Sequence, residues 1–485
     1  MRTKEIFFNQ RFIGRTKELV QLAKIGQSDK AHILILYGRR RVGKTELIEQ
    51  AYRDRNILKF EGLEGRGEGE QRFEVMRQLG EYSGQPLLVK IQTKTWQEVF
   101  QYIADVVRQG RWTIYFEEVQ WLANYESAFV AGLKYVWDNY FRHNNDLLLI
   151  LCGSSPSFMI KEIVHSKALY NRSTHEMALT KLDLIETQML LHGHGQREIM
   201  DAYLTVGGIP EYLQWLQEGA STFLSLCQQA FKKNGSFLRE FDKVFVSSLS
   251  NNPHYKKIVE FLAKKRFATR EEIAKHVKVT SGGSLTKILE DLLLCEFIQK
   301  YSPYNLNSDS PLARYCISDE YLQFYYQFIK PIKNRIKAGE FDSEPTKAIS
   351  IARYHQWLGY AFERFCRHYY RVIAKILGFS GVDFKVGSFF NRAINKENPG
   401  YQIDLLFERK DRVYTVCEVK YVEGCIGTEV IEEIEKKLKL FPNKKDYTIQ
   451  RVLITNAGAD QALMRRSYFD KIITFKELFD ESNWK

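Results

Sequence analysis

The chain of 485 residues has little of what marks secreted, fibrous or membrane proteins. It contains only 7 cysteines, with no C-x-x-C pair and no cluster of cysteine with histidine, and only 10 prolines. No apolar run approaches the roughly 18 residues of a membrane-spanning helix, and the first residues lack the apolar stretch of a secretory signal. Low-complexity tracts and fixed-period repeats are also absent. We therefore expect a globular, cytoplasmic protein with reduced thiols and no membrane association.

The length and charge of the chain narrow the class further. A chain of this size is expected to fold as two to four domains. Lys and Arg number 71 against 59 Asp and Glu, which gives a formal net charge of +12. Such a balance favours a polyanionic partner such as nucleic acid. A basic protein without any nucleic-acid role remains the alternative.

The clearest motif follows an apolar run of strand length. Residues 33–37 lead into a G-x-x-x-x-G-K-[ST] loop, and a helical pattern comes after it. Between a strand and a helix, such a loop curls its backbone N–H groups around phosphate. Lys44 is expected to reach the β- and γ-phosphates of ATP, and the Thr45 hydroxyl to ligate Mg²⁺. The predicted nucleotide-binding residues are Gly38, Arg39, Arg40, Arg41, Val42, Gly43, Lys44 and Thr45.

Polar residues end two further buried strands. The apolar run 113–116 is followed by Glu117 and Glu118. We predict Glu117 as a metal ligand and Glu118 as the catalytic residue that polarises the attacking water, although two acids also occur in plain surface turns. The run 147–152 leads to Ser154. A hydroxyl at the carboxyl edge of a parallel sheet can contact the γ-phosphate, so Ser154 is predicted to sense it; a plain Gly-Ser turn is the alternative.

Alternating strand-like and helical stretches predict a parallel α/β sheet for the first part of the chain. Residues 186–245 are predicted to be mainly helical, with a sharp turn at Gly207 and Gly208. The strand-like runs are 32–37, 56–60, 112–117, 147–152 and 176–180.

Together these segments resemble archaeal and bacterial P-loop ATPases of the AAA+/STAND kind. The resemblance covers about residues 8–245 and depends on the motifs FIGRTKEL, YGRRRVGKT, the acidic strand end, CGSS, ALYNRS and GGIPEYL, in that order. It implies that Arg172 approaches the γ-phosphate as a sensor or finger, in trans if the protein is a homo-oligomer. The family usually has Asp-Glu where this chain has Glu117-Glu118, a departure that bears on hydrolysis more than on binding. The resemblance also implies a slow ATPase acting as a switch, and an adenine lying near Phe12, Ile13, Arg15 and Pro210.

Residues 253–330 change character and predict a small helical module. Three amphipathic helical patterns are followed by two strand-like runs around a polar tip at 302–310. Three helices and a two-stranded wing describe a winged helix, whose third helix can enter the major groove of DNA. That helix carries Lys287 against Glu290 and Asp291. Contact with DNA and a structural or protein-docking role therefore both stay open.

A predicted hairpin near the end of the chain opposes two carboxylates. If the sequence ERKDR turns the chain about Asp411, then Asp404 and Glu418 are equidistant from the turn and lie opposite each other. Opposed Cβ atoms are about 4.5–5.5 Å apart, and two carboxylates that close repel unless a cation lies between them. We therefore predict Asp404 and Glu418 as ligands of Mg²⁺ or Mn²⁺. Lys420, one pleat further, can orient water or stabilise charge on a phosphate.

This pattern resembles the PD-(D/E)XK nuclease superfamily, whose motif is an acid, a hairpin and Glu-x-Lys. Asp404, Glu418 and Lys420 match it, and Glu363 matches the acid often found on the preceding helix. The resemblance implies a mixed α/β domain of the restriction-endonuclease kind, with these four residues as its catalytic set. Whether such a domain cuts nucleic acid or is kept as a non-cutting module stays open.

The predicted fold is multidomain α/β, and the leading hypothesis is an ATP-dependent switch coupled to a metal-dependent nuclease that acts on nucleic acid, with DNA favoured. The alternative is a non-cleaving, ATP-regulated scaffold that binds nucleic acid or a protein partner. A third reading is a signalling or chaperone-like ATPase whose basic charge is incidental. The predicted domains are a P-loop core at 1–185, a helical lid at 186–249, a winged helix at 250–330, a polar linker at 331–350 and a nuclease-like domain at 351–485.

Overall fold

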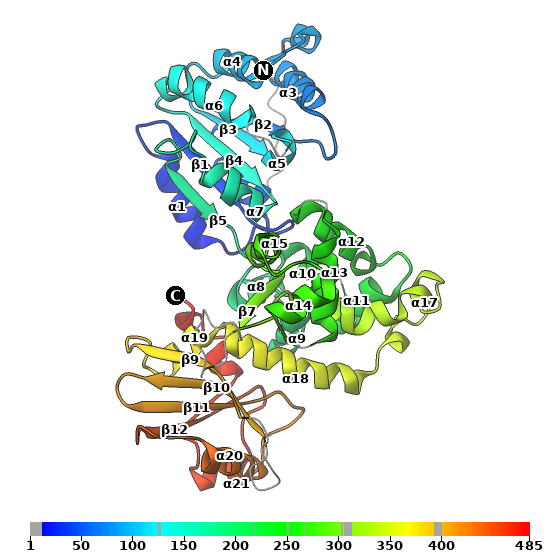
Figure 1. Ribbon diagram of the computed structural model, residues 1–485, viewed down its shortest axis with the longest axis vertical. Coiled ribbons are helices and arrows are strands. Elements are labelled where there is room, and N and C mark those ends of the chain that lie inside the picture. The colour runs from blue at the N-terminus through cyan, green and yellow to red at the C-terminus, as the bar shows by residue number, and fades with distance from the viewer. Residues whose placement is uncertain are drawn as a thin grey trace.

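The computed structural model is elongated, with an α/β sheet at one end, a helical middle and a second sheet at the other end (Figure 1). The polar tip predicted at 302–310 lies outside the described residues, apart from Tyr304. No helix in the described part of the chain is long and apolar enough to span a membrane. The structure describes residues 12–124, 128–217, 219–249, 252–265, 267–301, 304, 313–391 and 400–485.

The first sheet is wholly parallel, in the order β2-β3-β4-β1-β5, which confirms the predicted parallel-sheet core. Each strand lies within two residues of its predicted bounds. Strands buried on both faces read as continuous apolar runs, which is why the sequence revealed them. The strands are β1 (His32–Tyr37), β2 (Asn56–Glu61), β3 (Trp112–Glu117), β4 (Leu148–Gly153) and β5 (His175–Ala178).

Helices cover both faces of this sheet (Figure 1). Leu34 and Leu36 of β1 pack with α1 and α2, whereas the alternate residues Ile33 and Ile35 pack with α3, α4 and α6. This alternation follows from the two-residue period of a strand. The helices are α1 (Thr16–Gly26), α2 (Lys44–Ala51), α3 (Glu68–Ser83), α4 (Trp96–Val106), α5 (Val119–Leu122), α6 (Ala128–Asn139) and the short α7 (Pro156–Phe158).

Residues 184–248 are helical, as expected for this stretch. The chain turns between α9 and α10 at Gly207, whose φ is +71°. A Cβ on the next residue, Gly208, would lie 1.9 Å from the carbonyl oxygen of Leu182, so only glycine fits there. The helices are α8 (Leu184–Leu190), α9 (Gln196–Val206), α10 (Pro210–Gln217), α11 (Thr222–Phe231) and α12 (Ser236–Ser248).

The middle module consists of three helices and a small antiparallel sheet in the order β6-β8-β7. Its third helix packs against the N-terminal α/β part of the chain, called here the first body. Buried Asp291 of that helix accepts hydrogen bonds from Ser157 and from Lys161 Nζ, the latter at 2.8 Å. One face of this helix is therefore used inside the chain. The elements are α13 (Pro253–Lys264), α14 (Arg270–Val277), α15 (Gly283–Leu294), β6 (Ala268–Thr269), β7 (Ile298–Tyr301) and β8 (Arg314–Ile317).

Short helical segments occupy the stretch expected as a polar linker. After α16 (Glu320–Phe324), the chain forms α17 (Lys333–Lys337) and a helical turn at Pro345–Ala348. Ile336, Phe341 and Ile349 are buried in the same hydrophobic cluster as the helical middle. The stretch is therefore packed rather than solvated along its whole length.

The C-terminal body is a mixed sheet in the order β13-β12-β11-β10-β9. The β9–β10 and β10–β11 pairs are antiparallel, and the β11–β12 and β12–β13 pairs are parallel. Helix α18 covers one face and α20 and α21 the other. The elements are α18 (Ile351–His368), α19 (Tyr370–Ile376), β9 (Phe384–Asn391), β10 (Tyr401–Arg409), β11 (Val413–Lys420), α20 (Glu429–Leu440), β12 (Thr448–Thr455), α21 (Gln461–Arg466), β13 (Lys471–Ile473) and α22 (Phe475–Leu478).

Candidate functional site

The glycine-rich loop joins the carboxyl end of β1 to α2. A Cβ on Gly38 would lie 2.2 Å from the carbonyl oxygen of Leu179, and Gly43 has a φ of +88°. Both positions therefore require glycine. Lys44 is buried, and its Nζ donates to the carbonyls of Gly38 at 3.0 Å and Arg39 at 2.9 Å. The ammonium group thus lies inside the curved loop, where the phosphates of a nucleotide would bind.

Thr45 and Glu117, which are predicted to bind the same Mg²⁺ ion, are in contact. The Thr45 hydroxyl donates to Glu117 Oε1, and Glu117 Oε2 pairs with Lys59 Nζ at 2.8 Å. A hydroxyl and a carboxylate are the ligands that Mg²⁺ takes beside phosphate oxygens, so the two residues fit the ion. The longer side chain at 117 does not keep the carboxylate from the hydroxyl. Lys59 was not foreseen, because an isolated lysine in a strand carries no motif.

Glu118 and Ser154 also come together, at the ends of the neighbouring strands β3 and β4. Glu118 has a φ of +53°, and its Oε2 accepts from the Ser154 N–H at 3.1 Å and from the Ser154 hydroxyl at 2.6 Å. Gln120 donates to the same oxygen at 2.7 Å. In this arrangement the Ser154 hydroxyl donates its hydrogen bond to the Glu118 carboxylate. To contact a phosphate, the hydroxyl would have to give up that bond.

The segment expected near the adenine lies against the loop. Arg15 Nη2 donates to the carbonyls of Val42 at 3.0 Å and Thr180 at 2.7 Å. Burial lowers the pKa of Arg15, although nearby carboxylates partly oppose the shift. Phe12 and Ile13 pack, partly buried, on the same hydrophobic core.

Arg41 ties the loop to the start of α10, where Pro210 lies. Its guanidinium pairs with Glu211 and, at 2.8 Å, with Glu240. It also lies over the ring of Trp215, 5.1 Å from the centroid. The segments predicted to surround the nucleotide are therefore brought together, except for Arg172; the side chain of Arg40, within the loop, is exposed.

Arg172 does not approach the γ-phosphate position of its own chain, which corrects the expectation. The nearby Thr174 N–H donates to the carbonyl of Ile33, at the amino end of β1. The loop begins at the other end of that strand, five residues on, or roughly 16 Å at the rise of a strand. Arg172 pairs instead with Asp138 of α6, at 2.7 and 2.8 Å. A contact in trans from a second copy stays a prediction.

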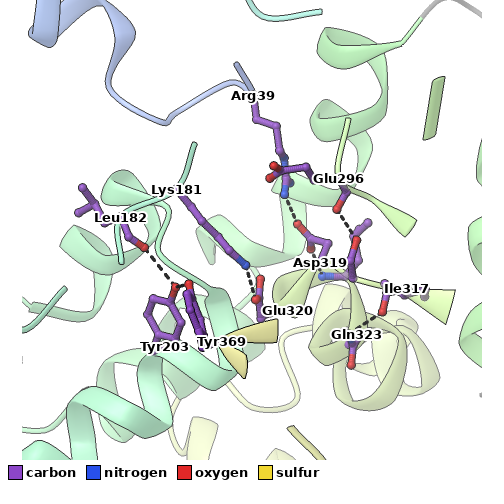
Figure 2. A network of polar contacts seen from close by, with 12 residues as sticks. Arg39, Lys181, Leu182, Tyr203, Glu296, Ile317, Asp319, Glu320, Gln323 and Tyr369 are labelled. Atoms are coloured by element: carbon purple, nitrogen blue, oxygen red, sulfur yellow. Dashed lines mark hydrogen bonds and ion pairs between the residues drawn. The ribbon is translucent and has the colours of Figure 1, made fainter. Parts of the chain in front are cut away.

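Arg39 points away from the curl of the loop and into a buried polar network (Figure 2). Its guanidinium pairs with Asp319, and the two side chains are 9% and 3% exposed. Burial by itself lowers the pKa of Arg39, but Asp319 outweighs it and the pKa is raised. Asp319 also caps α16 by accepting the Leu322 N–H at 2.5 Å. Arg39 of the loop is therefore held by the N-cap of α16, the helix that follows the last strand of the middle module.

The same network extends to the C-terminal body (Figure 2). Lys181, after β5, pairs with Glu320 of α16, whose carboxylate raises the pKa of that lysine to about 12 against the effect of burial. The hydroxyls of Tyr203 in α9 and Tyr369 at the end of α18 are hydrogen-bonded. Sequence reasoning missed this junction, because its members lie far apart along the chain and belong to no motif.

The hairpin has the predicted register. Leu405 lies opposite Cys417, which places Asp404 opposite Glu418. The β9–β10 register shifts between Ile403 and Leu406, at Asp404, and such bulges re-aim a side chain. Both carboxylates are buried, at 8% and 3% exposure. Burial raises the pKa of each; the neighbouring carboxylate of Glu363 adds to the shift at Asp404, and Asp404 adds to it at Glu418.

A lysine already supplies positive charge to this pair. Lys437 Nζ of α20 donates to both oxygens of Glu418, at 2.6 and 2.8 Å, and Lys420 Nζ lies 3.3 Å from Oε1. The pair fits a divalent cation by charge and burial, but among the described residues no group of three or more His, Cys, Asp or Glu is placed to hold one. A metal at this pair would therefore meet Lys437 as a competing cation at Glu418. Sequence reasoning missed Lys437, because the Glu/Lys pattern of its helix is typical of a solvated face.

The loop geometry and the sheet order define a P-loop ATPase domain. Residues 12–216 match the model of a family described as an ATPase domain predominantly from Archaea. The chain is 25% identical over 414 residues to an uncharacterized protein of Methanocaldococcus jannaschii, MJECL04, covering 84% of this chain and 87% of the relative. A segment of 46 residues is 46% identical to an uncharacterized ATP-binding protein, MJ0423, of the same organism; it covers 10% of this chain and 78% of that protein.

Solved structures that the chain matches include the Walker-type ATPase PABY2304 of Pyrococcus abyssi and the ORC2 protein of Aeropyrum pernix. The first is 19% identical with a TM-score of 0.48, over 65% of this chain and 96% of its own. The second is 10% identical with a TM-score of 0.45, over 69% of this chain and 98% of its own.

Proposed function

We propose that this protein is an ATP-dependent switch whose nucleotide site controls a metal-dependent, nuclease-like domain acting on nucleic acid. The observation that carries the proposal is the ion pair of Arg39 with Asp319. It joins the phosphate-binding loop to the buried junction where the middle module and the C-terminal body meet. A change in the loop therefore has a direct physical route to the rest of the molecule.

Lys44 and Arg39 are the residues that carry the switch. When Lys44 turns to the phosphates of ATP, it gives up the carbonyls of Gly38 and Arg39, the backbone of the same residue whose guanidinium is held by Asp319. The loop and the junction therefore respond together. Thr45 and Glu117 would hold Mg²⁺, which neutralises charge on the phosphates. Glu118 orients the attacking water once it no longer holds Ser154.

The carboxylate pair supports a nuclease function, in which water hydrolyses a phosphodiester bond. Asp404 and Glu418 would hold a divalent cation that supplies an activated water. Water would form a bond to phosphorus as the bond to the leaving oxygen breaks, the water's proton would pass to that leaving oxygen, and Lys420 would stabilise the negative charge on the phosphate. Under this proposal the three bodies are a P-loop ATPase, a winged helix and a PD-(D/E)XK domain.

A non-cleaving scaffold is the second candidate, and one observation favours it. Lys437 holds both oxygens of Glu418, so the cation that the pair requires is present as an ammonium group. If that pair is permanent, the hairpin is inherited architecture and ATP regulates binding alone.

A cleavage assay separates the two candidates. Purified protein is incubated with plasmid, linear duplex, single-stranded DNA and RNA, with Mg²⁺ or Mn²⁺, and with and without ATP. The nuclease proposal expects products that are lost in Glu418→Ala and whose yield depends on ATP in the parent protein but not in Lys44→Ala. Absence of products under every condition would remove the nuclease function and leave the scaffold.

A further inference from the structure

A groove of about 420 Å³ separates the middle module from α18. One wall comes from the end of α13, the strands β7 and β8 and the turn after α16. The other wall is a single face of α18, since the lining residues recur three or four positions apart along the helix. The residues that form this wall are Arg353, Gln356, Trp357, Tyr360, Arg364 and Arg367.

The lining chemistry suits a nucleic-acid strand. Four cationic side chains, Lys264, Arg353, Arg364 and Arg367, line the groove, and no Asp or Glu does among its described lining residues. Tyr360 is 41% exposed and shares the groove with Trp357. Cations that meet phosphates, interleaved with rings on which bases stack, are the elements of single-strand recognition. The volume lies in the range of pockets for small ligands, roughly 300–1,000 Å³, which suits an unstacked nucleotide rather than a duplex.

The groove leads to the carboxylate pair. Arg367, at its end, lies 3.4 Å from Glu363, and Arg367 is one of the groups that lower the pKa of Asp404 against the larger effect of burial. A strand in the groove would thus bring its phosphates toward the hairpin. The third helix of the middle module is less suited to this role, because Asp291 fixes one of its faces on the first body.

We propose that this groove binds single-stranded nucleic acid, stacking a base on Tyr360 and holding phosphates on Arg353 and Arg367, and directs the strand to Asp404 and Glu418. The inference deepens the proposed function and rests on its nucleic-acid substrate. DNA and RNA share the chemistry used here, so both are tested.

Stacking is tested by fluorescence anisotropy with labelled oligothymidylate and oligouridylate of about 20 nucleotides, in EDTA so that nothing is cut. Tyr360→Ala is expected to weaken binding about tenfold, as the loss of one stacked base does, and Tyr360→Phe to keep it. Tyr135→Ala is the matched control, because Tyr135 is 43% exposed but lies on α6 of the first body. Its binding should equal that of the parent protein.

Phosphate contact is tested with Arg353→Glu against Arg371→Glu, an exposed arginine on α19 outside the groove. Only Arg353→Glu should make the fall of log affinity with log salt less steep. The slope should decrease in magnitude by at least the roughly 0.7 expected for one contact to a single strand. Thermal unfolding of each variant checks that the fold is kept.

The outcomes separate the groove from the proposed function. If the parent binds oligonucleotides and neither groove variant differs from its control, the groove is wrong while the nucleic-acid function stands. If duplex binds as tightly as single strands and competes for the groove, the single-strand assignment is wrong. If the parent binds no polynucleotide at all, both the groove and the nucleic-acid part of the proposed function fail.

Discussion

At the residue scale, burial and charge conflict at Asp404. Burial raises its pKa, with Glu363 adding to the shift, so the native state holds this proton to higher pH than the unfolded chain does. A carboxyl with a raised native pKa makes the native state less stable as pH rises from its ordinary value of 3.8 through the native value. The metal-free protein is therefore destabilised at neutral pH by this group.

Replacing that carboxyl should stabilise the metal-free protein at neutral pH. In EDTA, Asp404→Asn is expected to raise the free energy of unfolding at pH 7 relative to the parent protein, because the neutral amide places no buried charge beside Glu363 and Glu418. The gain should shrink as the pH falls toward 4. Thermal unfolding at several pH values measures it, and an equal effect at all pH values would contradict the argument.

The Arg39–Asp319 ion pair allows an unusually close comparison, because the next residue in the loop is also an arginine. Arg39→Ala leaves the buried Asp319 carboxylate without its guanidinium and should cost about 3–5 kcal/mol of unfolding free energy. Arg40→Ala removes an exposed side chain and should change stability by less than about 0.5 kcal/mol. Denaturant unfolding of both variants tests this; similar losses would show that the pair is not a special anchor.

Single residues also show what the sequence could and could not predict. The register of Asp404 and Glu418 follows from a turn only a few residues away, so local spacing was enough to find it. Lys437 reaches Glu418 from a different element, and no spacing rule connects them. Arg172 was misplaced for the same reason: its motif gives an order along the chain, whereas the parallel sheet decides which edge it reaches.

At the scale of elements, α20 lies over the carboxylate pair and supplies its cation. If Lys437 competes with a metal, Lys437→Met should raise the affinity of the pair for Mn²⁺ several-fold, because the metal no longer has to displace the ammonium. Lys436→Met is the matched control, since the neighbouring lysine on the same helix is exposed. Calorimetric titration without nucleotide, in a Glu117→Ala background, removes the carboxylate that the P-loop site offers to a metal. A Lys437→Met protein that binds Mn²⁺ no better than Lys436→Met would exclude this competition.

Elements with a strong period were predictable and packed surfaces were not. The strands of the first sheet are continuous apolar runs, and the helices of the middle follow the helical period, so both appear in the sequence. The stretch at 331–350 reads as polar, yet Ile336 and Phe341 are buried, because a few apolar residues suffice where neighbouring helices provide the surface. The docking of α15 through Asp291 depends on tertiary contacts that no local pattern encodes.

At the scale of the whole molecule, the three bodies share buried contacts rather than flexible tethers. Helix α18 packs with the helical middle and with the C-terminal sheet in one hydrophobic cluster, and it forms a wall of the proposed groove (Figure 1). The junction of Arg39, Asp319 and Glu320 lies between the phosphate-binding loop and this helix (Figure 2). ATP binding at the loop is therefore expected to alter how the groove binds its ligand.

The most direct test is the affinity of the full chain for a labelled single-stranded oligonucleotide with and without saturating ATP, under conditions that prevent cleavage. Coupled sites typically differ by about 5- to 150-fold in affinity, and a change in this range is predicted for the parent protein. The change should disappear in Lys44→Ala, which lacks the phosphate-binding ammonium, while binding without ATP persists. An oligonucleotide affinity that is the same with and without ATP in the parent protein would contradict the switch.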